Sequence, residues 1–441
     1  MPQATFHFPP GFMWGSSTAA HQVEGNNTNN NWYSWENIPG HIKQDQKAGL
    51  ACDWWGGRWK EDLDRAAEYG QNAHRLSIEW SRIQPAPDRW DEDALEFYRR
   101  IGRGMVERGL TPMVTLHHFT DPLWLVEQGG WENDDTPLKF AAFVRRVVEA
   151  LKEYASLWVT INEPNVYTFS GYVLHDFPPG KTDLEASFRV TRNLLRGHAA
   201  GYRAVHEVQN SAQVGYAHHH RPFLPLQGWS PLDRLIAAVV NQVFNFSFPL
   251  ALSTGTLNFI YKRARLPELL HTQDFFGLNY YTVDQIGFAL SPADRYIQHH
   301  VPKELEQSES GMIANDPQEF FSTLHWVNKQ GLPIIVTENG IDDASDTVRP
   351  RYLVEHIHQV WRALNFNWPV KGYFHWTLVD NFEWERGWTQ RFGLWGLDPA
   401  TQVRTRRASA EIYAEICRTN SISSAMVERL APQLIPKLFP G

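Results

Sequence analysis

Short apolar segments alternate with longer amphipathic ones along this chain, and this alternation is the strongest constraint on its fold. The apolar segments have the length and composition of buried strands, and most intervals between them show the 3.6-residue periodicity of helices. Strand followed by helix, repeated eight times, predicts an α/β protein that folds as a (β/α)8 TIM barrel. The predicted strands are Phe12–Ala19, Ala73–Trp80, Thr111–His118, Leu157–Glu163, Ala212–His218, Phe275–Thr282, Pro333–Glu338 and Val370–Leu378.

One domain is expected, because no linker, internal repeat or low-complexity tract divides the chain. We predict a single catalytic domain over 1–441, in which 421–441 is a tail packed on the barrel. A long loop is expected over 291–317. Gly70, Gly109 and Gly331 stand where helices are expected to end. The clearest predicted helices are 59–69, 95–108, 139–154, 317–329 and 352–364.

Two of the predicted strands end in a carboxylate. Residues 333–340 read PIIVTENG and place Glu338 at the strand end, and residues 157–164 read LWVTINEP and place Glu163 there. A buried carboxylate is costly unless it has a partner, and active sites of such barrels lie at the C-terminal ends of the strands. An ordinary turn is the simpler interpretation of Glu-Asn-Gly alone. Two strand-end carboxylates converging on one mouth favour glycoside hydrolysis.

Charge and composition exclude several other classes. The formal net charge of −8 and the pI near 6.2 argue against binding to nucleic acid or to an anionic membrane surface. No apolar stretch approaches the length of a membrane span, and the N-terminus has no basic region followed by an apolar run. Cys52 and Cys417 are the two cysteines, which is no disulfide framework. A cytoplasmic location is therefore expected.

The segments INEP and VTENG, in this order and separation, resemble the retaining β-glycosidases of glycoside hydrolase family 1. The resemblance extends from about Phe6 to Asn420. It implies double displacement, with Glu338 as nucleophile and Glu163 as acid/base. It also implies small β-glycosides or oligosaccharides as partners. The expected substrates are terminal unphosphorylated β-D-glucosides, with β-D-galactosides and β-D-fucosides second. A glucosyl-transferring β-glucosidase is the alternative, because water and sugar compete for one intermediate.

The resemblance also assigns roles to other strand-end residues. Arg75, Asn279 and Tyr281 match residues that support the nucleophile, and a fixed cation such as Arg75 is expected to lower the pKa of Glu338. Phe119 stands where the family usually has a tryptophan. The residues that match sugar-binding positions are Gln22, His118, Phe119, Asn162, Trp376, Glu383 and Trp384.

Three rival interpretations were weighed. A sugar-binding protein without activity would keep Trp376 and Glu383 but lose a catalytic carboxylate, whereas both are present. Glycosidases of other families in the same barrel clan share the two glutamates but not the DNFEW segment found here. The run His218–His220 suggests a metal site, but adjacent strand residues point to opposite faces and cannot all bind one ion. We therefore expect no metal and no cofactor; a homo-oligomer is left open.

Overall fold

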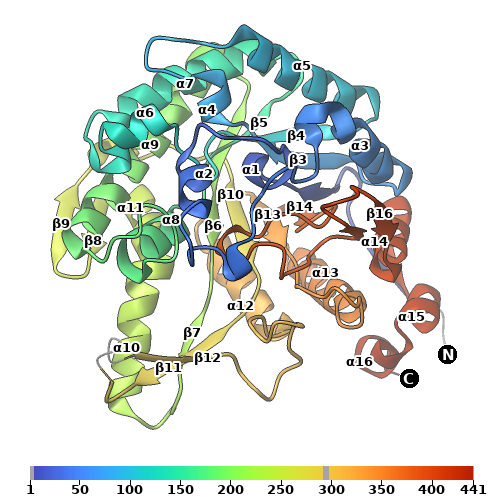
Figure 1. Cartoon of the computed structure of the whole chain (residues 1–441). Helices are drawn as coiled ribbons and strands as arrows, with labels where there is room; N and C mark the ends of the chain where they lie inside the picture. The colour runs from blue at the N-terminus through green and yellow to red at the C-terminus, as the bar shows by residue number, and fades with distance from the viewer. Residues whose placement is uncertain (1–3, 292–296, 441) are drawn as a thin grey trace.

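The computed structural model describes residues 4–291 and 297–440, and its centre is a closed barrel of parallel strands (Figure 1). Every predicted strand segment supplies one barrel strand, so the predicted (β/α)8 barrel is confirmed. Each strand pairs with the next one along the chain, and the last pairs with the first. The strands are β2 (Met13–Ser17), β3 (Ala73–Ser77), β4 (Thr111–Thr115), β5 (Leu157–Asn162), β6 (Gln213–His219), β10 (Phe276–Tyr280), β13 (Ile334–Asn339) and β14 (Val370–His375).

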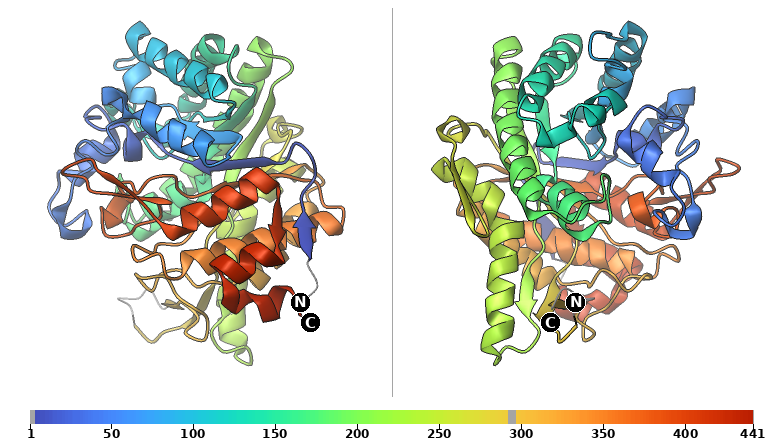
Figure 2. Two further views of the ribbon diagram at one scale, coloured as in Figure 1. Left: turned by 90° about the vertical axis from the view of Figure 1, so that its right-hand side faces the viewer. Right: turned by 60° about the vertical axis from the view of Figure 1, so that its left-hand side comes forward.

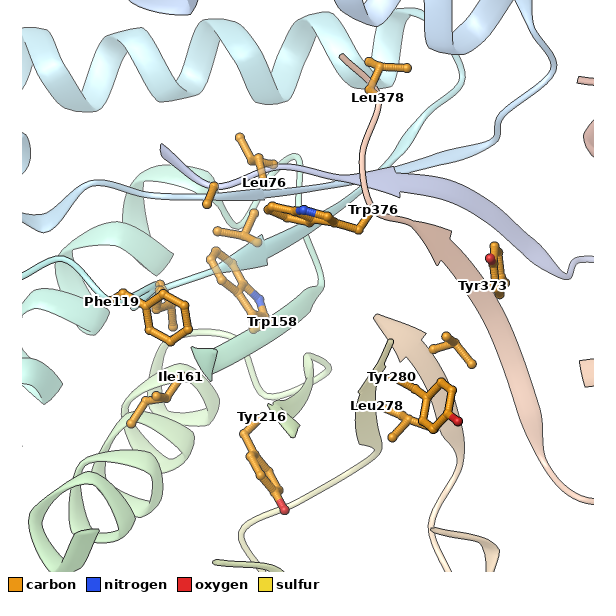
Figure 3. Close-up of a cluster of buried hydrophobic side chains, with 14 of the residues drawn as sticks. Leu76, Phe119, Trp158, Ile161, Tyr216, Leu278, Tyr280, Tyr373, Trp376 and Leu378 are labelled. Atoms are coloured by element: carbon orange, nitrogen blue, oxygen red, sulfur yellow. The ribbon is translucent and has the colours of Figure 1, made fainter. Parts of the chain in front are cut away.

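The strands are rich in apolar residues because both of their faces are buried. Small and medium-sized side chains, among them Ala73, Met113 and Ala217, form one buried cluster inside the barrel. Larger side chains such as Trp158 and Tyr216 leave the strands on the other face and join the main core beneath the helices (Figure 3). The alternation explains why the strands contain no regular polar positions except near their C-terminal ends.

The helices around the barrel follow the predicted order, with small differences at their ends. All five helices that the periodicity predicted most clearly are present. The longest helix, α9, packs along α7, and the two form the most extensive helix pair of the structure. The long helices are α3 (Trp59–Glu68), α5 (Glu92–Glu107), α7 (Thr136–Leu151), α9 (Leu184–Val208), α12 (Pro317–Asn328), α13 (Arg349–Asn365) and α14 (Ala408–Thr419).

Short helices and helical turns occupy the loops between the barrel elements. The short helices are α1 (Ala20–Val23), α2 (Asn31–Glu36), α4 (Trp80–Ile83), α6 (Leu123–Glu127) and α8 (Pro164–Phe169). The turns are η1 (Lys43–Asp45), η2 (Trp54–Arg58), η3 (Gly130–Glu132), η4 (Ser170–Leu174), η6 (Pro267–Leu269) and η7 (Trp384–Arg386).

The segments around β10 carry additional sheets. The predicted loop 291–317 is wrong in part, because β12 lies within it and pairs with β11 in an antiparallel ladder. Residues 292–296 of that loop lie outside the described residues. Alternation of polar and apolar residues is too short there to predict a strand. These strands are β7 (Phe223–Pro225), β8 (Thr256–Phe259), β9 (Lys262–Arg265), β11 (Asp284–Phe288) and β12 (Ile297–His300).

One helical run corrects the expectation about apolar length. Residues Pro231–Thr254 comprise α10 (Pro231–Asn241), η5 (Gln242–Phe246) and α11 (Ser247–Thr254). A window of this run as long as a membrane span has a mean hydropathy of 1.6. By length and composition alone, the run could therefore cross a membrane. Half of that window is buried inside the structure, and core helices pass the same test. The sequence analysis missed this run because Asp233 and Arg234 interrupt it near its start.

The two ends of the described chain lie side by side (Figure 2). Strand β1 (Thr5–His7) pairs with β17 (Ser421–Ser423), and the ring of Phe439 stacks on that of Phe6 with centroids 4.6 Å apart. The proposed limits of the domain and of the 421–441 tail stay a prediction. The remaining elements are β15 (Trp395–Leu397), β16 (Arg404–Arg406), α15 (Ser424–Leu430), η8 (Pro432–Leu434) and α16 (Ile435–Leu438).

Two glycines just beyond helix ends allow a matched test of backbone strain and packing. Gly70 and Gly109 have φ angles of 80° and 72°, as a left-handed cap requires. A Cβ at position 109 would meet nothing within 4 Å, whereas one at position 70 would lie 2.5 Å from Cγ of Arg418. Gly109→Ala should destabilise by about 1 kcal/mol, from the left-handed backbone alone. Gly70→Ala should destabilise more in urea unfolding; equal losses would contradict the packing argument.

Candidate active site

Glu338 lies at the end of β13 and is held by two donors from other strands. Tyr281, just after β10, donates its hydroxyl to Oε2 of Glu338 at 2.6 Å, and Arg75 on β3 forms an ion pair with Oε1. The side chain of Arg75 is fully buried, and Glu338 is 3% exposed. Of the three residues predicted to support the nucleophile, Arg75 and Tyr281 thus contact Glu338, whereas Asn279 donates to Glu163 instead.

Arg75 also reaches two neighbouring strands. Its Nε donates to Thr115 Oγ1 at 3.0 Å, and Nη2 donates to Asn162 Oδ1 at 2.7 Å. The amide nitrogen of Asn162 is 3.0 Å from Nε2 of His118. Because a guanidinium is a planar fork with five N–H groups, one side chain can fix residues from three strands at once. Predicted sugar-contacting residues are therefore anchored to the same cation as Glu338.

Glu163 follows β5 directly and is the residue before helix α8. Its φ of 44° is in the left-handed region, and its backbone N–H donates to the carbonyl of Ala217 on β6. Asn279 Nδ2 donates to Glu163 Oε1 at 2.7 Å and to Asn162 Oδ1 at 3.1 Å. Hydrogen bonds therefore connect Glu163 to Glu338 through Asn279, Asn162 and Arg75. The two predicted catalytic carboxyls belong to one network inside one mouth.

His219 is a member of this site that the sequence analysis missed. Its Nδ1 is 3.0 Å from Glu163 Oε1, and it lies beside Asn279 in the register of β6 and β10. The strand pattern indicates its orientation. Ala217 points into the barrel, and His219, two residues later on the same strand, shares that face. Strand alternation therefore separates His219, which faces the mouth, from His218 and His220.

The residues predicted to contact a sugar gather at the ends of β2, β4 and β14. Gln22 Nε2 is 3.2 Å from Glu383 Oε2 and 2.8 Å from the carbonyl of Phe382. The His118 ring stacks at 6.1 Å from Trp376 and at 5.9 Å from Trp384. Figure 3 places Trp376 just past the end of β14, with Phe119 on the other side of the mouth.

Phe119 follows β4 and stands where the family usually has a tryptophan. It is buried and meets Trp384 edge to face, with centroids 5.2 Å apart. An apolar wall is thus retained, but phenylalanine has no indole N–H to donate to a sugar hydroxyl. Its φ of 67° lies in the left-handed region, which residues other than glycine rarely adopt.

Electrostatics in the mouth favour protonation of its carboxyls. Burial raises the pKa of Glu338 to about 7 against the opposing effect of Arg75, and the charge of Glu163 adds to the rise. The prediction that the pKa of Glu338 is lowered is therefore wrong for the net shift. Arg75 does lower this pKa, as expected, but burial raises it more. Burial also raises the pKa of Glu383 well above its usual range, with Glu385 and Glu338 contributing repulsion. Glu338 and Glu383 therefore lose their protons at higher pH than exposed carboxyls do.

The histidine run offers no set of metal ligands. The rings of His218 and His220 lie 6.2 Å apart on one face, and His219 points to the other face toward Glu163. Over residues 4–291 and 297–440, no group of three or more His, Cys, Asp or Glu side chains is arranged to hold a metal ion.

Comparison with known proteins decides the family. The sequence model of glycosyl hydrolase family 1 matches residues 4–422. A 1,4-β-D-glucan glucohydrolase of Thermotoga neapolitana is 32% identical, over 94% of this chain and 99% of that protein. A β-galactosidase of Sulfolobus acidocaldarius is also 32% identical, over 94% of this chain and 96% of that protein.

The chain belongs to glycosyl hydrolase family 1.

Solved structures agree with this assignment. A β-glycosidase from Pyrococcus horikoshii superposes with a TM-score of 0.89 and 33% identity, covering 97% of this chain and 98% of that one. A β-glucosidase from Thermotoga maritima in complex with glucoimidazole gives a TM-score of 0.88 and 31% identity, covering 95% and 100%. The family 1 protein is therefore a glycoside hydrolase, and the retaining mechanism is general to its family.

Tyr281 allows a test of the charge balance at Glu338. Its hydroxyl lowers the pKa of Glu338, so Tyr281→Phe should raise that pKa. The acidic limb of kcat/KM for a glycoside should then move to higher pH by about one unit, because hydrogen bonds to charged groups contribute about 1.5–3 kcal/mol. The measurement is the pH profile of kcat/KM on an aryl glycoside.

Tyr280→Phe is the matched control. The Tyr280 hydroxyl donates to the carbonyl of Asp316, away from the carboxyl pair, so its removal should leave the acidic limb in place. A Tyr281→Phe profile that stays unchanged or moves to lower pH would contradict the assigned direction.

Proposed function

We propose that the chain is a retaining β-glycosidase that hydrolyses terminal unphosphorylated β-D-glucosides, with Glu338 as nucleophile and Glu163 as acid/base. The supporting observation is the hydrogen-bond network that holds both carboxyls in one mouth. Of the two carboxyls, Glu338 alone contacts Arg75 and the hydroxyl of Tyr281. The relatives named as glucan glucohydrolase, β-glucosidase and β-galactosidase support glucosides, with galactosides as further substrates. The proposal of fucosides rests on the family resemblance of the sequence alone.

In the first half-reaction Glu338 attacks the anomeric carbon and Glu163 protonates the departing oxygen. Arg75 and Tyr281 both stabilise the anion of Glu338, which is the form that attacks, and Glu163 supplies the proton to the leaving group. The bond from the sugar to the leaving group breaks as the bond to Glu338 forms. The product is a glycosyl ester of Glu338.

In the second half-reaction Glu163 accepts a proton from water, which attacks the same carbon and releases Glu338. Esterification has meanwhile removed the negative charge of Glu338 from the mouth. Asn162 is fixed by Arg75 and can bind the hydroxyl next to the reacting carbon, where hydrogen bonds strengthen in the transition state.

Gln22 and Glu383 suit the hydroxyls at the far end of the sugar. The Gln22 amide offers both a donor and an acceptor, and its Oε1 is buried without a partner in the part of the chain that the structure describes. The raised pKa of Glu383 allows its carboxyl to donate one hydrogen bond and accept others. Trp376 and Trp384 supply apolar faces beside this polar pair.

A glucosyl-transferring enzyme is the second candidate, because the ester on Glu338 reacts with a sugar hydroxyl as well as with water. Analysis of products at rising sugar concentration distinguishes the two: new disaccharides indicate transfer, and free glucose alone indicates hydrolysis. A cytoplasmic location remains a proposal, for which cell fractionation is the test.

Removal of the acid/base should affect substrates unequally. Glu163→Ala should slow glycosides with poor leaving groups by about 10²–10⁴-fold, the usual contribution of general acid–base catalysis. Aryl glycosides with acidic phenols need no proton and should form the ester rapidly, then stall. Azide fits the vacated space and should restore turnover with a β-glycosyl azide product. Equal losses on both substrates without azide rescue would remove Glu163 from this role.

The role of Glu338 as nucleophile and the retention of configuration at the anomeric carbon can be tested independently. A 2-deoxy-2-fluoro-β-glucoside should inactivate the enzyme by a stable ester, and mass spectrometry of peptides should place that sugar on Glu338. Glu338→Ala should abolish both labelling and hydrolysis. NMR of early product should show the β-anomer; an α-anomer would reject double displacement.

Phosphorylated sugars should be excluded. The hydrogen bonds to Glu383 come from Gln22 and Trp376, neither of which is a cation, and Arg386 is already paired with Glu385. A 6-phosphate would place a poorly compensated dianion there, and an unpaired buried charge costs about 3–5 kcal/mol. The kcat/KM for an aryl 6-phospho-β-glucoside should be at least about a hundredfold below that for the glucoside. Equal or faster turnover would overturn this selectivity.

A further inference from the structure

We propose that His219 is a positioning residue for Glu163: it binds Oε1 of the acid/base, so that the transferable proton resides on Oε2. The proposal rests on the function assigned to Glu163 above and adds which oxygen of that carboxyl carries the proton.

The side-chain amide of Asn279 donates one of the two hydrogen bonds to Oε1 of Glu163. The same amide lies 3.1 Å from Asn162 Oδ1, which is identified as the oxygen because Arg75 Nη2, a group that can only donate, is hydrogen-bonded to it. Nδ2 is therefore the atom that faces Glu163 Oε1 at 2.7 Å, and it can only donate. Oε1 already accepts one hydrogen bond before His219 is considered.

The Nδ1 atom of His219 lies 3.0 Å from the same oxygen. The hydroxyl oxygen of a carboxylic acid is a weaker acceptor than its carbonyl oxygen, so an oxygen that accepts from Asn279 is favoured as the carbonyl. The consistent arrangement has His219 donating from Nδ1–H and Oε1 accepting from both nitrogens. Glu163 Oε2 makes no hydrogen bond to any of the described residues, and it is the oxygen left to carry the proton.

Packing holds the His219 ring in this orientation. The ring stacks on Tyr281 with centroids 5.6 Å apart and meets Phe244 edge to face at 5.9 Å. The side chain is 12% exposed. In the Nδ1–H tautomer, Nε2 carries no proton, which suits its buried position without a partner among residues 4–291 and 297–440.

The same ring thus connects the two carboxyls. It binds Glu163 through Nδ1 and packs on Tyr281, which donates to Glu338. A carboxyl whose Oε1 is fixed by two donors cannot rotate to exchange its oxygens without breaking both hydrogen bonds. Oε2 would therefore give the proton in the first half-reaction and take one from water in the second.

The test compares two substitutions at this position. His219→Phe keeps a ring that can stack on Tyr281 but removes both nitrogens. His219→Asn places an amide nitrogen where Nδ1 lies and can preserve the donor. The measurement is kcat/KM on a series of β-glucosides whose leaving groups range from acidic phenols to alcohols.

His219→Phe should reduce kcat/KM for alkyl glucosides about tenfold or more, a fraction of the usual contribution of a general acid. The most acidic phenols should react almost as fast as with the parent enzyme, so the dependence on leaving-group acidity should steepen. His219→Asn should recover most of the loss. A uniform loss across the series, or no recovery with Asn, would overturn the proposal.

A double substitution separates this proposal from the assignment of Glu163. In a Glu163→Ala background, His219→Phe should add no further loss on alkyl glucosides, because the group that it positions is absent. Losses that multiply would reject the positioning role. If Glu163→Ala itself does not discriminate between leaving groups, the assigned function fails instead.

His218→Phe is the matched control for folding. The His218 ring faces away from the mouth and packs near Trp326 and Phe276. It should leave the leaving-group dependence unchanged. A steepened dependence in His218→Phe equal to that in His219→Phe would assign the effect to the fold and overturn the proposal.

Discussion

The buried ion pair between Arg75 and Glu338 organises the mouth of this barrel. A fully buried guanidinium needs a partner for its charge and acceptors for its remaining N–H groups. Glu338 supplies the charge, and Thr115 and Asn162 supply acceptors from two further strands. Removing either charge would leave the other unpaired in a dry interior. The requirement to satisfy Arg75 therefore fixes the relative positions of strands β3, β4, β5 and β13 where chemistry takes place.

The carboxyl pair depends on this arrangement because each member is held differently. Glu338 receives a cation and a hydroxyl, which favour its anion, whereas Glu163 receives the amide of Asn279 and the ring of His219. Similar residues in dissimilar surroundings can take opposite roles in one reaction. The barrel provides this asymmetry by drawing these neighbours from β3 and from the ends of β6 and β10. No loop has to close to create it.

The sequence predicted the barrel well because buried parallel strands have a strong and simple signature. The partners of Glu338 were also predicted, since Arg75 and Tyr281 stand at strand ends and match family positions. Other features depend on neighbours that periodicity does not specify. To predict the place of His219 one must know the register of β6 against β10, and to predict β12 one must know its partner strand β11. To predict the net pKa shift of Glu338 one must know how deeply it is buried. Burial outweighs the effect of Arg75, the cation that the sequence did reveal.

The left-handed backbone at Glu163 places stability and activity in conflict at one residue. A side chain at this φ of 44° raises the free energy of the folded chain by about 1 kcal/mol relative to glycine, and the buried carboxyl adds a desolvation penalty. A glycine there would relieve both while deleting the proposed acid/base. Directed evolution of this chain for heat resistance alone would therefore favour loss of Glu163. Any thermostable library needs a turnover screen in every round to retain that residue.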